Sequence, residues 1–92
     1  MENVKITELS AYQGKYLYLV DIAGSSHRIT LSRDYWLELN DGTQPAAQLI
    51  LDSVMFLLSR EPKEKIMSEF DLSDIKKYFP DYEEFIKNKK ET

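Results

Sequence analysis

The chain has 92 residues, of which 42% are hydrophobic and 30% charged, with a formal net charge of −4 and no cysteine. This acidic balance disfavours nonspecific binding to nucleic acid or anionic lipid, and the lack of cysteine excludes disulfides and thiolate metal ligands. The most apolar segment, 46–58, is shorter than the roughly 20 residues that span a bilayer, and the N-terminus lacks a signal-peptide pattern. We therefore expect one cytoplasmic domain over 1–92 with its last few residues frayed.

The first third of the chain alternates apolar and polar residues, which is typical of half-buried strands. In the segment 16–22, for example, Tyr16, Tyr18, Val20 and Ile22 share one face. The pattern predicts a three-stranded antiparallel meander with one apolar face, its strands at about 3–9, 15–22 and 26–31.

The two turns of this meander set which residues face one another. A three-residue loop over 12–14 is expected, because it places Val4 on the same face as Val20, whereas a two-residue loop would reverse every side chain of the first strand. For the second turn we expect a two-residue loop, Gly24-Ser25, which would place Val20 opposite Ile29.

The remainder of the chain predicts about four helices, so the expected fold class is α+β. Ser32 and Thr43 are suitable N-caps, and Pro62 should end the long apolar helix before it. Pro80 interrupts the helical spacing of the C-terminal segment, so that segment should be kinked or broken there. The expected helices lie at 33–39, 44–60, 62–69 and 72–88.

The long helix is apolar over more than half of its circumference. Between 46 and 58 only Gln48, Asp52 and Ser53 are polar, which is wider than the usual apolar stripe of a surface helix. Such a helix should be covered on more than one side. The cover could come from the C-terminal helices alone, or partly from a second copy of the chain.

Three segments carry a resemblance to a known group. The residues 29–36 (ITLSRDYW), 56–66 (FLLSREPKEKI) and 70–82 (FDL…YFPDY) resemble a pattern shared by small uncharacterised bacterial proteins that have no assigned activity. The resemblance implies a self-contained domain and implies nothing about activity, cofactors or site residues.

Candidate catalytic and metal-binding residues are few. His27 is the only histidine, and no partners at the spacing of a triad or a metal cluster accompany it, so a structural or surface role is expected. Asp71 and Asp74 suit the start of a helix. The three glycines are isolated at turns rather than grouped in a phosphate-binding loop. We predict no catalytic, cofactor-binding or metal site, and no small-molecule ligand is implied.

One alternative is a DNA-binding regulator or antitoxin of the ribbon–helix–helix type. The order of strand 27–31, short helix and long helix fits that unit, in which outward-facing Arg28 and Thr30 would contact base edges from a two-stranded dimer ribbon. The pairing of this strand with 15–22 and the shortage of basic residues weigh against nucleic acid.

The sequence therefore favours a small non-enzymatic protein-interaction module, an adaptor or accessory subunit whose partner is another protein or a second copy of the chain. A membrane is not expected as a partner. An enzyme with no linear signature is the second alternative. The expected interaction surface combines large apolar residues of the long helix and of the C-terminal segment: Leu49, Phe56, Tyr78 and Tyr82.

Overall fold

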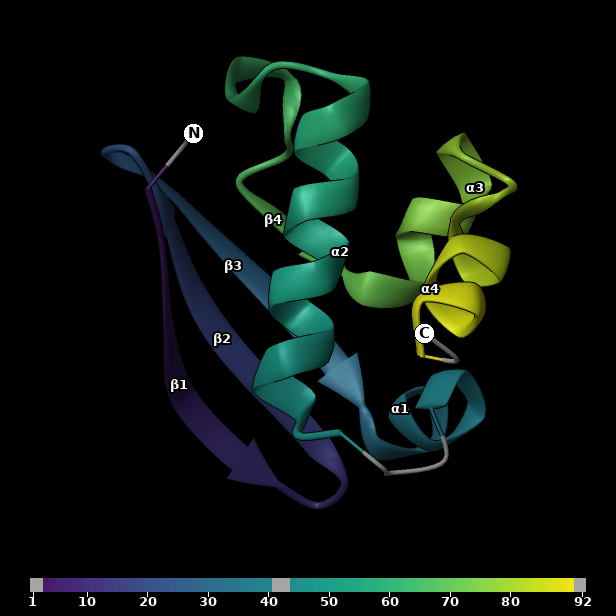
Figure 1. The fold of residues 1–92 in the computed structure, drawn as a ribbon. Helices are drawn as coiled ribbons and strands as arrows, with labels where there is room; N and C mark the ends of the chain where they lie inside the picture. Colours follow the sequence, from purple (N-terminus) through teal and green to yellow (C-terminus); the bar gives the residue numbers. More distant parts are fainter. Residues whose placement is uncertain (1–2, 41–43, 91–92) are drawn as a thin grey trace.

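The computed structural model describes residues 3–40 and 44–90 and confirms the α+β class (Figure 1). A four-stranded sheet has the order β1-β2-β3-β4, which corrects the prediction of three strands. The strands are β1 (Val4–Tyr12), β2 (Lys15–Ile22), β3 (Ser25–Ser32) and β4 (Glu69–Asp71). The helices are α1 (Arg33–Asn40), α2 (Ala46–Arg60), α3 (Ile75–Tyr78) and α4 (Tyr82–Lys90), with short 3-10 turns η1 (Lys63–Lys65) and η2 (Leu72–Asp74). No described helix combines the length and apolarity needed to cross a bilayer.

The first turn differs from the prediction, although the faces of the strands do not. Tyr12 pairs with Lys15, so the loop is the two-residue Gln13-Gly14, both at positive φ. Such a loop alone would reverse β1. A register shift between Glu8 and Ser10 compensates, because a β-bulge adds one residue to one strand. The apolar residues near the start of β1 therefore still face the core.

The second turn is Ala23-Gly24 rather than the predicted Gly24-Ser25. Both residues have positive φ, and the Gly24 N–H donates to Asp21 Oδ1 at 2.9 Å, which stabilises the turn. Val20 consequently lies opposite His27 instead of Ile29. This shift of the partner by two residues keeps every side chain on its predicted face, because side chains alternate with a period of two.

The predicted helix 62–69 is wrong. Only the single turn η1 follows Pro62, and the chain then extends into β4, which pairs with β3 in parallel. The Arg28 N–H donates to Ser68 O at 2.7 Å. The local sequence is compatible with a helix, but pairing with the free edge of β3 satisfies the extended backbone and buries Phe70.

The helix α2 lies between the sheet and the C-terminal helices (Figure 1). One of its sides contacts aromatic residues: the Phe56 ring meets those of Phe79, Tyr82 and Phe85 at centroid distances of 5.0–5.9 Å. Other residues of α2, such as Ile50 and Val54, belong to the same core cluster as the inner face of the sheet. The expectation that this helix is covered on more than one side is confirmed.

Helix boundaries follow the predicted signals in two places. Ser32 Oγ accepts a hydrogen bond from the Tyr35 N–H at 3.1 Å and so caps α1. The C-terminal segment is broken at Pro80, where α3 has ended and α4 begins two residues later. The other expected cap, Thr43, lies outside the described residues, and α2 starts after Pro45.

Candidate functional site

A pocket of about 330 Å³ lies between the C-terminal end of α2, the segment that leads into β4, and α3. Most of its lining side chains are apolar or aromatic, and the two exceptions carry opposite charges. The lining residues are Leu57, Glu61, Lys65, Ile66, Met67, Phe70, Ile75, Tyr78 and Phe79.

The apolar side chains that line this pocket differ in their exposure. Leu57, Ile66, Phe70 and Ile75 also belong to the hydrophobic core and are buried, so they form a fixed apolar base. Met67 and Tyr78 are large apolar residues that are 44% and 65% exposed. The pocket is therefore open to solvent beside side chains that a bound partner could cover.

The wall formed by 61–68 is held by contacts with the β2–β3 hairpin. His27 Nδ1 lies 2.8 Å from Met67 O; because a carbonyl only accepts, Nδ1 donates this hydrogen bond. On the other side of the ring, Nε2 is hydrogen-bonded to the Ser25 hydroxyl at 2.9 Å. Lys63 Nζ donates to Ala23 O at 2.7 Å. These contacts between distant parts of the chain fix the wall before any ligand binds.

The opposite wall, which includes α3, is held by contacts of Arg60 near the break at Pro80. Arg60 forms an ion pair with Asp81, and its guanidinium carbon lies 4.5 Å from the centroid of the Phe56 ring and 6.0 Å from that of Phe79. The Arg60 contact holds the pKa of Asp81 below its usual range. The end of α2 is thereby tied to the junction of α3 and α4.

The four residues of the expected interaction surface are separated by the fold. Leu49 and Phe56 are each 1% exposed, and Tyr82 is fully buried. These three side chains pack inside the chain, so they offer no surface to a partner. Tyr78 is exposed and lines the pocket, and it remains the candidate contact residue of that set.

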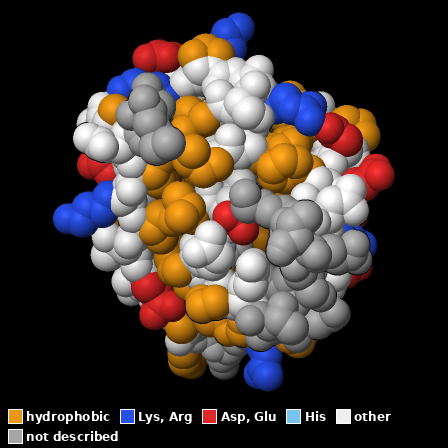
Figure 2. Space-filling model, in the orientation of Figure 1, with side chains coloured by type: hydrophobic (Ala, Val, Ile, Leu, Met, Phe, Trp, Pro, Cys, Tyr) orange, Lys and Arg blue, Asp and Glu red, His pale blue; other side chains and the backbone are white. Residues whose placement is uncertain are grey.

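A second apolar surface lies on α2 itself. Ala47, Leu51, Met55 and Leu58 recur at helical spacing and are partly or largely exposed. In Figure 2 apolar side chains gather along and beside α2, with most charged side chains toward the margins. Nothing in the structure indicates what would cover this face, and self-association through it stays a prediction.

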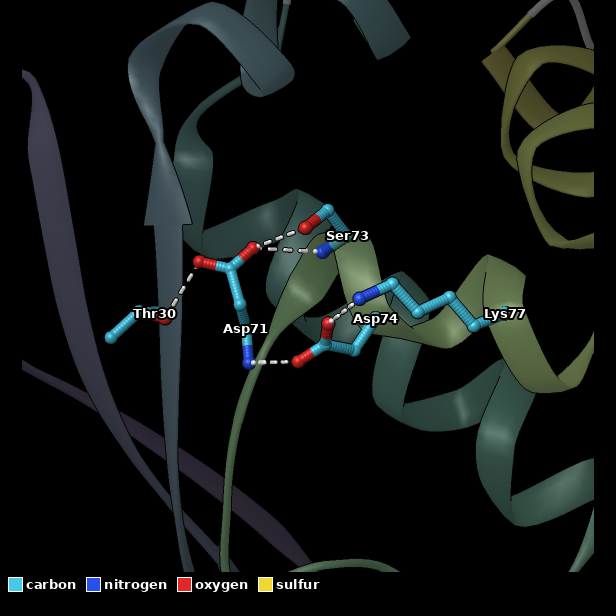
Figure 3. Close-up of polar contacts among 5 residues, drawn as sticks. All are labelled: Thr30, Asp71, Ser73, Asp74 and Lys77. Carbon is cyan, nitrogen blue, oxygen red and sulfur yellow. Dashed lines mark hydrogen bonds and ion pairs between the residues drawn. The ribbon is translucent and has the colours of Figure 1, made fainter.

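The strand of the DNA-binding alternative is already paired on both sides. β3 is paired with β2 on one side and with β4 on the other, whereas a ribbon–helix–helix dimer needs a free edge of this strand. Arg28 lies beside Glu69 in the register, and Thr30 Oγ1 donates to Asp71 Oδ2 at 2.8 Å (Figure 3). This geometry disfavours base contacts from β3.

The same Asp71 caps the turn that leads into α3. Its Oδ1 accepts from the Ser73 N–H at 3.0 Å, while Asp74 Oδ2 accepts from the Asp71 N–H at 3.2 Å (Figure 3). Lys77 Nζ contacts Asp74 Oδ1 at 3.0 Å and holds the pKa of Asp74 below its ordinary value. The predicted helix-start role of these two aspartates is confirmed as a capping box.

Three buried tyrosines are poorly suited to acid–base work near neutral pH. Burial raises the pKa of Tyr18 to about 12, and burial likewise raises the pKa values of Tyr35 and Tyr82. A general base needs a pKa closer to the working pH. Among the described residues, no group of three acidic or histidine side chains is arranged to hold a metal ion.

Comparisons of the chain with protein-family models, with curated proteins and with solved structures found no match. The resemblance of 29–82 to small bacterial proteins stays a prediction.

Proposed function

We propose that this protein is an interaction module that binds one large apolar side chain of a partner protein in the pocket between α2 and α3. The observation that carries the proposal is the pocket itself: an apolar base formed by core residues, opening beside exposed Met67 and Tyr78. Tyrosine and methionine are enriched at protein interfaces, and apolar anchors that enter preformed pockets dominate binding energy there.

The size of the pocket supports a side chain as its occupant. Pockets for small molecules usually have about 300–1,000 Å³ and enclose most of their ligand. At about 330 Å³ this pocket is at the lower end of that range. A protein segment can fill such a volume with one anchoring side chain. The residues next to that anchor in the segment then cover the exposed residues around the pocket.

The free edge of the sheet at β1 is another surface that could bind a protein segment. β1 is nine residues long and lies at that edge. It contains Lys5 and Glu8, and a bulge interrupts its pairing. Charged residues and bulges are the features by which natural edge strands avoid pairing with other chains, so the edge is a poorer binding surface than the pocket.

A matched pair of variants tests the proposal. Met67→Glu places a charge beside the pocket, whereas Leu9→Glu places the same charge on β1 at an equal exposure, 44% against 45%. Peptides that bind the wild-type protein are first selected from a random linear library displayed on phage, and their dissociation constants are then measured. We expect Met67→Glu to weaken binding at least tenfold, because it brings a charge into an apolar contact, and Leu9→Glu to leave it unchanged.

The exposed tyrosines provide a second matched pair. Tyr78→Asp should reduce peptide binding, while Tyr12→Asp, at 72% exposure on β1, should not. Thermal melting of all four variants checks that they fold. Equal loss of binding in a pocket variant and its β1 control, or recovery of no binding peptide at all, would contradict the proposal.

A further inference from the structure

Two side chains of opposite charge line the pocket beside its apolar residues. Glu61 and Lys65 both line the pocket, and each is four residues from the other. Within the described part of the chain neither takes part in an ion pair. The other basic residues nearby are engaged elsewhere: Arg60 with Asp81, and Lys63 with the carbonyl of Ala23.

The backbone holds the two charged residues in place. Glu61 is the C-cap of α2; its N–H donates to Leu57 O at 2.9 Å, and its backbone is extended, as expected before Pro62. Lys65 ends η1, where its N–H donates to Pro62 O at 3.0 Å. Both side chains therefore start from a hydrogen-bonded backbone, which lowers the backbone entropy lost when they contact a ligand.

Building on the proposed function, we propose that the partner segment carries a basic and an acidic residue flanking its apolar anchor, the first contacting Glu61 and the second Lys65. Opposite charges at two fixed positions of the pocket lining favour one order of the two partner residues and disfavour the reverse order, since like charges would then meet. The pocket selects for an apolar anchor, and the charged pair selects for its orientation and flanking sequence.

A charge exchange tests this directly. The double variant Glu61→Lys/Lys65→Glu keeps the net charge of the protein and reverses only the local pattern. Phage selections are carried out in parallel on the wild-type protein and on the double variant. We expect the wild type to enrich peptides with a large apolar residue between one basic and one acidic residue in a fixed order, and the double variant to enrich the opposite order.

Binding measurements then quantify the preference. A peptide selected on the wild type should lose about tenfold in affinity when its two charges are exchanged and regain it on the double variant. The difference should shrink at high salt, because exposed charges are screened. Glu64→Lys, a charge reversal on the same turn at a residue that does not line the pocket, should not change the preference.

Three outcomes of these experiments distinguish the charge preference from the binding of an apolar side chain. If the wild type and the double variant enrich the same peptides, and Met67→Glu still weakens binding, the charge preference is wrong and the apolar pocket stands. If neither protein enriches any peptide, both proposals fail. If the pocket instead binds a free aromatic amino acid saturably and no peptide, a small molecule is its ligand and both are overturned.

Discussion

Ser53 on α2 and Tyr82 on α4 are joined by a hydrogen bond of 2.5 Å between their hydroxyl oxygens in the interior. Ser53 Oγ also lies 2.7 Å from Leu49 O, which can only accept. Because the serine hydroxyl has a single hydrogen, it donates to Leu49 O, and the Tyr82 hydroxyl is the donor to Ser53. This contact, together with the ring packing of Phe56 against Tyr82, fixes α4 on α2.

Removing either hydroxyl should have unequal effects. Tyr82→Phe deletes one hydrogen bond and leaves Ser53 bonded to Leu49, so we expect a loss of about 0.5–1.5 kcal/mol in the free energy of unfolding. Ser53→Ala leaves the Tyr82 hydroxyl buried without its acceptor, which should cost about 1–3 kcal/mol. Urea denaturation of both single variants and of the double variant checks this. Strictly additive effects would contradict the assigned contact.

The buried tyrosines predict a loss of stability at alkaline pH. Burial is the largest cause that raises the pKa values of Tyr18, Tyr35 and Tyr82 above the ordinary 10.0. Below about pH 10 both folded and unfolded chains keep these hydroxyls protonated, so their contribution to stability is fully present. Above it the unfolded chain ionises first, and stability falls as the pH rises toward the pKa of Tyr18, about 12.

Each tyrosine that ionises only in the unfolded chain lowers the free energy of unfolding by up to about 1.4 kcal/mol per pH unit. Denaturation curves at successive pH values, with tyrosinate absorbance followed in parallel, measure this. The result that would sink the prediction is a folded protein in which all six tyrosines ionise near their ordinary pKa.

Substitutions at the Asp71 cap should lower the free energy of unfolding by graded amounts. Asp71→Ala removes the bonds to Thr30 and to the Ser73 N–H, and we expect a loss of about 1–2 kcal/mol in the free energy of unfolding. Thr30→Val removes only the first bond and should cost less than Asp71→Ala. Asp34→Ala, at an exposed position of α1, is the control. Equal stability of Asp71→Ala and the control would show that the cap contributes nothing.

His27 should stabilise the pocket wall formed by 61–68 through its hydrogen bond to Met67 O. His27→Leu leaves Met67 O without its donor and should cost about 1–3 kcal/mol. It should also speed hydrogen exchange of the amides between Ile66 and Phe70. His27→Asn can place an amide N–H near the position of Nδ1 and should restore part of the protection. If both variants exchange at the wild-type rate, the histidine does not position the wall.

Local signals in the sequence predict much of the fold. The alternation of apolar residues places the strand faces correctly, the proline at 80 predicts the break, and the apolar width of α2 predicts its cover on two sides. The errors in the two predicted turns of the meander have the same cause. A bulge near Glu8 and a left-handed Ala23 leave no clear pattern in a single sequence, because each depends on the pairing that it serves.

The missed strand β4 and the pocket have a different cause. Both depend on contacts between residues about 40 positions apart, such as His27 with Met67 and Thr30 with Asp71. Helical propensity over 62–69 is a local preference, and tertiary hydrogen bonds override it. The lining residues come from elements that are separate in the sequence. Of the four residues of the expected interaction surface, only Tyr78 lines the pocket.

The most direct test of the account is a titration of isotope-labelled protein with N-acetyl-tryptophanamide, an uncharged mimic of an aromatic residue within a chain. We expect saturable changes in the amide signals of Leu57, Ile66, Phe70 and Ile75, with those of Leu9 and Tyr12 unchanged, and loss of these changes in Met67→Glu. Changes confined to β1 or to the exposed face of α2, or no saturable change at all, would contradict binding of an apolar side chain in the pocket.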